Sequence, residues 1–228
     1  MEPKKVNDAR EIAGAIVSEV EALRVRNTPN LRAVRRKYSR ILEHAEGKFV
    51  LDLAREVHRT CRFRFMAAEL VRYHPQAMNL IGEKELAEFG QGIDGWGAVD
   101  VFAGLLAGPA WHRGQIPDRL VHKWARSPDR WWRRTALVST VPLNRRSVGG
   151  RGDIPRTLAV CRRLADDHDD MVEKALSWAL REIVPHDAKA VRSFLAEHDG
   201  VLGARVKREV RNKLSTGLKN PKRKQRRK

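Results

Sequence analysis

Residues 127–141, SPDRWWRRTALVSTV, end one predicted helix and begin the next within three residues. Ser127 and Pro128 stop the preceding helical segment, 116–126, because a proline disfavours helical geometry in the residue before it. Ser127 can also cap a new helix, Pro128 suits its first position, and Asp129 complements the positive end of the helix dipole. We therefore expect a firm helix over 129–141, joined to its predecessor by a very short loop.

Helical periodicity broken by short loops extends in both directions from this stretch. The first segment, 6–23, places Ile12, Ile16, Val20 and Leu23 on one face. Six further helices are predicted in the same way: 31–45, 48–60, 62–73, 83–89, 154–165 and 203–215. Another segment begins at Gly95 and is expected to close at Gly108-Pro109. A long helix should run from the acidic cluster 166–170 to Pro185, and a shorter one, 188–197, should have Asp187 as its cap. Between two of them, 145–153 (RRSVGGRGD) is expected to be a flexible basic loop.

The segment 31–45 is the most basic of these helices. Its periodicity directs one set of residues inward: Leu31, Val34, Tyr38, Ile41 and Leu42. Five basic residues are expected to face outward: Arg32, Arg35, Arg36, Lys37 and Arg40. A charge run of this kind usually marks a solvated face.

The arrangement of these segments predicts an all-α fold. No part of the chain alternates at period two with hairpin turns, and the helices come in loop-joined pairs roughly 30 to 40 residues apart, the spacing of helical repeats. We expect a curved solenoid of about five to six helical pairs, whose concave basic groove would suit a rod such as duplex DNA. Residues 1–217 would form this domain, and residues 218–228 a disordered basic tail.

The charge balance points to a polyanionic partner. The chain of 228 residues has 46 Lys and Arg against 28 Asp and Glu, a formal net charge of +18. Nucleic acid is the leading candidate, because neutralising phosphates releases condensed counterions. Without the seven basic residues of the tail the charge is still +11, so the folded body is basic by itself.

Other functional classes find little support in the sequence. No signal peptide, lipid anchor or apolar run of about 18 residues is present, so we expect no membrane partner. Cys61 and Cys161 lie outside any metal-ligand spacing, and the eight histidines form no i, i+4 pair. We expect a reduced, soluble cytoplasmic protein, associated with the nucleoid when bound to DNA, monomeric, and without metal or cofactor.

Residues 91–108, QGIDGWGAVDVFAGLLAG, set one indole and one carboxylate into an apolar segment. If Asp94 caps a helix, Trp96 and Asp100 stand four residues apart on one face. Gly95 and Gly97 disfavour ordinary helix packing, so we expect Trp96 to be exposed. A lone Asp100 would more often be a cap or an ion-pair residue than a catalyst.

Three motifs in this order carry a family resemblance. They are W-x-x-x-D at Trp96 to Asp100, W-x-x-R followed by TALVS at Trp131 and Arg134, and KALSWALRE at Lys174 to Glu182. Together they resemble the alkylpurine DNA glycosylases of the AlkD family, over about Arg32 to Arg211. The basic tail and Trp132 depart from the family pattern, which affects substrate range more than chemistry.

The resemblance implies a HEAT-like repeat fold that wraps duplex DNA and excises N3- and N7-alkylated purines without base flipping. It assigns Asp100 as the catalytic carboxylate, Trp96 and Trp178 as indoles that line the deoxyribose, and Arg134 as the residue that holds the backbone. We add Arg133, Trp131 and Arg181 as DNA-binding residues. For two of these residues a structural role stays open, Trp178 as core and Arg181, with Glu182, in ion pairs.

The residue types suit this chemistry. A purine alkylated at N3 or N7 is cationic, so its glycosidic bond is weakened and its departure needs no general acid. A carboxylate can stabilise the oxocarbenium-like sugar and position water, and indole faces favour a cationic sugar.

Two alternative hypotheses remain at this stage. A catalytically silent scaffold could bind DNA structures or bulky lesions, although Asp100 with both tryptophans favours the enzyme. A helical-repeat protein could also bind RNA or a protein partner, but a clearer repeat signature would then be expected.

Overall fold

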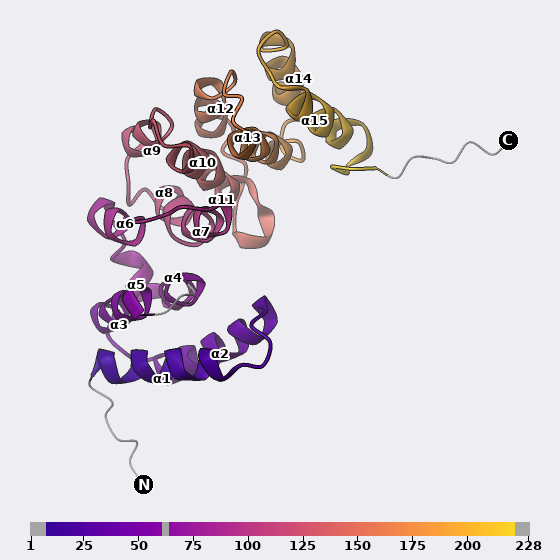
Figure 1. Ribbon diagram of the computed structural model, residues 1–228. Helices are drawn as coiled ribbons and strands as arrows, with labels where there is room; N and C mark the ends of the chain where they lie inside the picture. The colour runs from indigo at the N-terminus through magenta and orange to yellow at the C-terminus, as the bar shows by residue number, and fades with distance from the viewer. Residues whose placement is uncertain (1–7, 61–63, 222–228) are drawn as a thin grey trace, which may run out of the picture. The chain divides into compact units, whose positions relative to one another are not determined.

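The computed structural model describes residues 8–60 and 64–221, and every regular element within these ranges is helical (Figure 1). The chain divides into two compact units. Unit 1 comprises residues 1–93 and 100–116, and unit 2 comprises residues 94–99 and 117–228. The α-helices of unit 1 are α1 (Ala9–Ala22), α2 (Thr28–Ile41), α3 (Gly47–Thr60), α4 (Arg64–Arg72), α5 (Pro75–Asn79), α6 (Glu83–Phe89) and α8 (Gly108–His112). Those of unit 2 are α9 (Asp118–Trp124), α10 (Arg130–Ser139), α11 (Val141–Asn144), α12 (Ile154–Arg163), α13 (Asp170–Ile183), α14 (Ala188–Glu197) and α15 (Ala204–Thr216).

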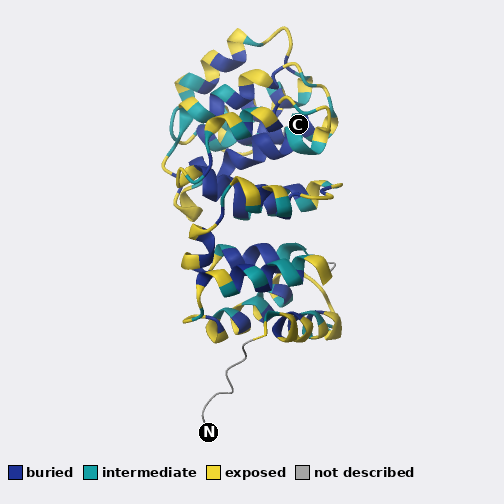
Figure 2. Ribbon diagram, turned by 90° about the vertical axis from the view of Figure 1, so that its left-hand side faces the viewer, coloured by how far each residue is buried: buried dark blue, intermediate teal, exposed yellow. Residues whose placement is uncertain are grey.

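In unit 1, α3 is the central helix and packs against α1, α4 and α5, while α2 packs on α4. The sequence forms these helices through local signals. Asp8 caps α1 by accepting a hydrogen bond from the backbone N–H of Arg10, and Ile12, Ile16 and Val20 form its buried stripe. Figure 2 shows the same division in other helices, with buried residues on one side and exposed residues on the other.

The basic face predicted for α2 is only partly solvated. Arg32 and Arg35 turn toward α4, where their Nε atoms lie 2.9 and 3.1 Å from the two carboxylate oxygens of Glu69. The prediction that both face outward is therefore wrong for Arg35, whose side chain is 12% exposed, and holds only in part for Arg32, whose side chain is 43% exposed, because the fully buried Glu69 draws both cations to it. Ile41 is exposed rather than inward, because α2 ends there and Leu42 takes the buried position.

In unit 2, α13 is the central helix and packs against α10, α11, α12, α14 and α15. Two side-chain hydrogen bonds, from Arg134 to Met171 and from Arg145 to Glu182, join residues that are 37 positions apart. A third, from Ser177 to Glu209, joins residues that are 32 positions apart. Unit 1 has the same spacing of 37 between Arg32 and Glu69. These separations are consistent with the helical repeats of 30 to 40 residues expected from the sequence.

The helix junction at 127–141 differs from the expectation in its cap. α10 begins at Arg130, and its N-cap is Asp129, whose carboxylate accepts from the backbone N–H of Trp131 at 2.8 Å. Ser127 instead accepts from the N–H of Asp129 at 3.2 Å, so it orders the turn before the helix. The predicted Asp187 cap of α14 is confirmed by its hydrogen bond from the N–H of Ala190.

The segment that begins near Trp96 does not close at Gly108. α7 (Trp96–Phe102) continues through a π-helical turn, η1 (Ala103–Ala107), directly into α8. Gly108 donates its backbone N–H to the carbonyl of Ala103, five residues back, and Pro109 follows in the first turn of α8. The prediction was wrong because the π-helical turn carries the chain through Gly108 and places Pro109 in the first turn of α8, a position that tolerates proline.

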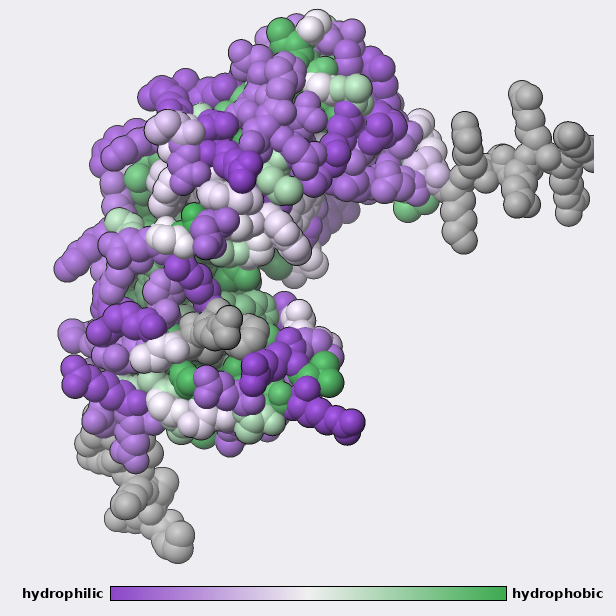
Figure 3. Space-filling view, in the orientation of Figure 1, coloured by the Kyte–Doolittle hydropathy of each residue, from purple (hydrophilic) through white to green (hydrophobic). Residues whose placement is uncertain are grey.

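The surface is largely hydrophilic, as Figure 3 shows for the visible face of each unit. Among the described helices, none is both long and apolar enough to cross a membrane. α15 is followed by its C-cap Gly217, which adopts a left-handed conformation. Of the predicted tail, residues 218–221 follow this cap outside any helix, and residues 222–228 lie outside the described residues.

Candidate functional site

The indole of Trp96 and the carboxylate of Asp100 are carried by α7, one helical turn apart. Trp96 is 61% exposed, as expected, and Asp100 is half-buried. Val99 and Phe102 are buried and hold the helix in place through its other side. A Cβ atom added at Gly95 or Gly97 would meet nothing within 4 Å, so there is free space beside the backbone on either side of Trp96.

Trp178 lies on α13 in a small polar cluster instead of the core. Its indole N–H donates to Oε1 of Glu182 at 2.8 Å, one turn along the same helix. Nη2 of Arg145 donates to the same oxygen at 2.7 Å, and the Arg145 guanidinium lies 5.2 Å from the centroid of the indole ring. The carboxylate thus fixes the plane of the ring, and the arginine covers part of one face through a cation–π contact.

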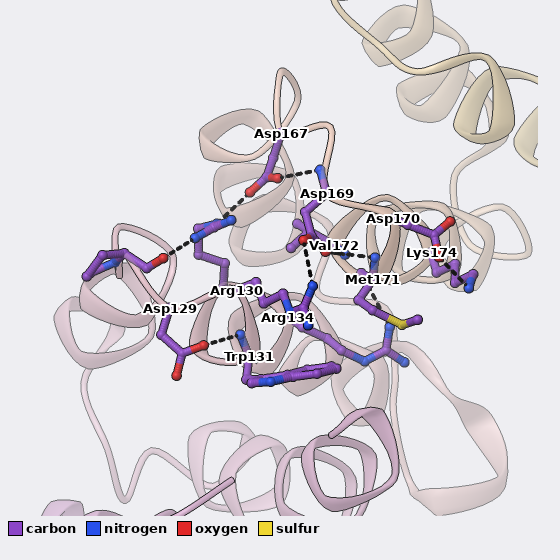
Figure 4. A network of polar contacts seen from close by, with 12 residues as sticks. Asp129, Arg130, Trp131, Arg134, Asp167, Asp169, Asp170, Met171, Val172 and Lys174 are labelled. Atoms are coloured by element: carbon purple, nitrogen blue, oxygen red, sulfur yellow. Dashed lines mark hydrogen bonds and ion pairs between the residues drawn. The ribbon is translucent and has the colours of Figure 1, made fainter. Parts of the chain in front are cut away.

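The arginines of α10 are engaged by the loop and first turn of α13 (Figure 4). Arg134 is only 5% exposed and donates to the backbone carbonyl of Met171 at 2.6 Å. Since Met171 precedes Trp178 by two turns of α13, this bond helps to place the helix that carries the indole. The DNA-backbone contact assigned to Arg134 stays a prediction.

Arg133 is held by one carboxylate and two backbone carbonyls of unit 2. Its Nε donates to Oδ2 of Asp167 at 2.6 Å, and its Nη1 donates to the carbonyls of Ser127 and Pro128 at 3.1 and 2.8 Å. Arg130 lies over the indole of Trp131, 4.8 Å from the ring centroid, and 3.4 Å from Oδ2 of Asp169. Arg133 therefore ties the start of α10 to the loop before α13, whereas Arg130 and Trp131 form a cation–π pair at the edge of that network.

Trp131 and Trp132 point in different directions, as their 100° separation around a helix predicts. The ring of Trp132 packs against Trp124 of α9 at 5.6 Å between centroids. Trp132 therefore has a packing role, which explains the additional tryptophan in the motif.

Arg181 belongs to a structural cluster between α13 and α15. Its Nε donates to the Ser177 hydroxyl at 3.2 Å, and Nη2 lies 4.0 Å from Glu209. Burial lowers the pKa of Arg181, while the negative charges of Glu209 and Glu182 oppose that shift. The structural ion pairs considered for Arg181 and Glu182 are present, and the DNA contact assigned to Arg181 stays a prediction.

Sequence reasoning missed the partners of Trp178. Glu182 could have been found, because a carboxylate four residues after a tryptophan shares its helical face. Arg145 had no local signal, because it lies 37 residues from Glu182 and on another element. Within residues 8–60 and 64–221, no group of three His, Cys, Asp or Glu side chains could hold a metal ion.

Comparison with known proteins gives one result that agrees with these motifs. The family model described as "DNA alkylation repair enzyme" matches residues 5–214, which span all seven site residues predicted from the sequence. A search of curated proteins found no match.

Proposed function

Because the chain belongs to the DNA alkylation repair enzyme family, we propose that it is a DNA glycosylase that removes N3- and N7-alkylated purines from duplex DNA. The observation that carries this proposal is α7, which presents an exposed indole one turn from a half-buried carboxylate. This pair occurs in a chain whose family acts in alkylation repair and whose formal charge is +18.

Asp100 would supply the main electrostatic contribution to the reaction. The alkylated purine already carries a positive charge, so it can depart as a neutral base when its bond to C1′ breaks. The sugar then approaches an oxocarbenium ion, which a fixed carboxylate stabilises. The same carboxylate can orient the water that attacks C1′ and accept its proton.

The two indoles would line the sugar. Trp96 is exposed, and Trp178 has its ring plane fixed by Glu182. Aromatic faces carry negative potential and favour a cation placed over them. Because these groups would act on the deoxyribose, we propose that the base can leave without being flipped into a pocket.

The basic body supports binding of a monomer along duplex DNA. We propose that residues 1–217 act as one DNA-binding module with a concave groove and that residues 218–228 add non-specific affinity. Phosphate neutralisation by Lys and Arg makes such binding strongly dependent on salt.

The test is single-turnover release of N7-methylguanine and N3-methyladenine from methylated duplex DNA at fixed salt. The wild type is compared with Asp100→Asn and with Asp94→Asn, a matched change at an exposed carboxylate near the start of α7. We expect release by the wild type and by Asp94→Asn, and loss of release in Asp100→Asn with duplex binding retained.

The opposite outcomes are equally informative. Equal release by Asp100→Asn and the wild type would remove the carboxylate from the mechanism. Tight duplex binding without release by the wild type would contradict excision of these lesions and favour a protein that binds DNA structures or bulky adducts.

A further inference from the structure

The loop between α11 and α12, residues 145–152, is closed by its own backbone hydrogen bonds. Val148 and Gly150 donate to the carbonyl of Arg145 at 3.1 and 3.0 Å, and Gly149 donates to that of Arg146 at 3.1 Å. Gly149 has φ of +89°, a conformation that favours glycine. The flexible loop expected from the sequence is therefore a defined turn, since its glycines allow it to close.

The root of this loop is packed against the body of unit 2. A Cβ atom at Gly150 would lie 2.5 Å from the carbonyl oxygen of Pro142, so the loop backbone directly contacts α11. Gly152 donates its N–H to the carbonyl of Leu143 at 3.2 Å. A Cβ at Gly152 would also meet the ring of His186, which contacts the carbonyl of Asn144 at 2.7 Å.

The loop presents a basic tip with an apolar residue at its centre. Arg146 and Arg151 are exposed, Val148 is 45% exposed, and residues 145–152 contain no acidic side chain. The first residue of the loop, Arg145, is the one that covers the indole of Trp178 and bonds to Glu182. The basic tip is therefore continuous with the cluster around Trp178.

We propose that residues 145–152 are a second DNA-contacting element, in which Arg146 and Arg151 bind phosphates of the duplex and Val148 lies against the sugar backbone between them. This inference rests on the proposed function only in that its ligand is the same duplex DNA. We identify duplex DNA as the ligand from its charge, because two exposed guanidinium groups on a preformed turn can bind the phosphates of a polyanion. A loop that is already ordered also loses little conformational entropy on binding.

The experiment measures the affinity for undamaged duplex DNA by fluorescence anisotropy over a series of salt concentrations. The double variant Arg146→Ala/Arg151→Ala is compared with Arg162→Ala/Arg163→Ala, which removes the same charge from exposed positions on α12. Two lost phosphate contacts should make the slope of log K against log[salt] shallower by about 2. We expect this change, with at least a tenfold loss of affinity at low salt, in the loop variant and a much smaller effect in the control.

A second variant, Gly150→Val, keeps every charge but displaces the loop from α11. It should lose a comparable part of the affinity if the shape of the turn matters. Equal losses in the loop variant and the α12 control would overturn the proposal, because only net charge would then matter. A change of slope with duplex RNA but not with duplex DNA would also overturn it.

The binding result and the proposed glycosylase activity can fail separately. Undamaged DNA reports on the loop even if the wild type releases no base. Conversely, release of alkylated bases with no specific effect of the loop variant would leave the glycosylase proposal intact and reject this one.

Discussion

Glu69 in α4 and Asp100 in α7 are both carboxylates on short helices, yet their surroundings differ. Glu69 is 0% exposed, and the Nε atoms of Arg32 and Arg35 lie 2.9 and 3.1 Å from its two oxygens. Asp100 is half-buried and stands one turn from an indole that is 61% exposed. A carboxylate enclosed with two cations is committed to the fold, whereas one at the edge of an exposed aromatic surface can meet a ligand.

The comparison makes opposite predictions for the two positions. Removing the charge of Glu69 should reduce stability and leave the chemistry intact, because Arg35, which is largely buried, and Arg32 would lose their counter-charge. Removing the charge of Asp100 should abolish chemistry while duplex binding is retained.

The largest expected effect is on excision by Asp100→Asn. Loss of a preorganised electrostatic group raises the barrier by about 3 to 4 kcal/mol, or roughly 100- to 1000-fold in rate. Single-turnover release measures this effect, and thermal unfolding of the variant and the wild type is compared beside it. A large fall in the unfolding temperature would place Asp100 with Glu69 among the structural carboxylates.

Glu69→Gln should lower the free energy of unfolding by about 3 kcal/mol, because breaking one side of a buried ion pair leaves an uncompensated charge. Urea unfolding measures the change, with the exposed Glu43→Gln as the matched control. Excision at a temperature where both variants are folded should stay near the wild-type rate. Unchanged stability would show that Arg32 and Arg35 gain nothing from Glu69.

Glu182→Gln tests whether the orientation of Trp178 matters. The amide weakens the hydrogen bonds from Trp178 and Arg145, so we expect roughly a tenfold slower excision and a loss of about 1 kcal/mol in stability. The exposed Glu197→Gln serves as control. If the excision rate is unaffected, the ring plane set by Glu182 has no catalytic role.

The smallest effect concerns pH and His58 in α3. Burial is the main cause that lowers the pKa of His58, and the charge of Arg64 adds to it, while Glu88 opposes it. The unfolded chain therefore binds a proton first, and stability should fall as pH drops below about 6.5 toward the lower folded pKa. His58→Gln should flatten that part of the curve of unfolding free energy against pH. An unchanged curve would assign the acid sensitivity to other groups.

Much of the fold could be predicted because its signals are local. The short helix 83–89 was predicted with the bounds of α6, 188–197 with those of α14, and the break at Pro185 follows the end of α13 at Ile183. α5 and α11 were missed, since five and four residues are too few to show helical periodicity. Pro109 misled the prediction because it occupies a helix start after a π-helical turn.

The contacts of the candidate site residues were predicted less completely, because the sequence shows where arginines occur but not which of them bind groups elsewhere in the chain. Arg133, Arg134 and Arg35 all belong to basic runs that look solvated in the sequence. In the structure each is drawn to a carboxylate or carbonyl on a neighbouring layer. By contrast, Arg146 and Arg151 in the loop are exposed, and no periodic pattern distinguishes them.

The sequence by itself determined most of the helices and most of their ends, because caps, prolines and 3.6-residue periodicity act over a few positions. It also determined the strong positive charge and the order of three motifs. Only the tertiary structure decided that Glu69 collects two arginines, that Arg145 covers the ring of Trp178, and that residues 145–152 form a closed turn. The physical reason is the repeat spacing. The partners of Glu69 and Glu182 lie 34 to 37 residues away in the sequence, and the loop 145–152 depends on packing against another helix. The environment of each side chain is therefore set by a neighbouring helix that the local sequence does not specify.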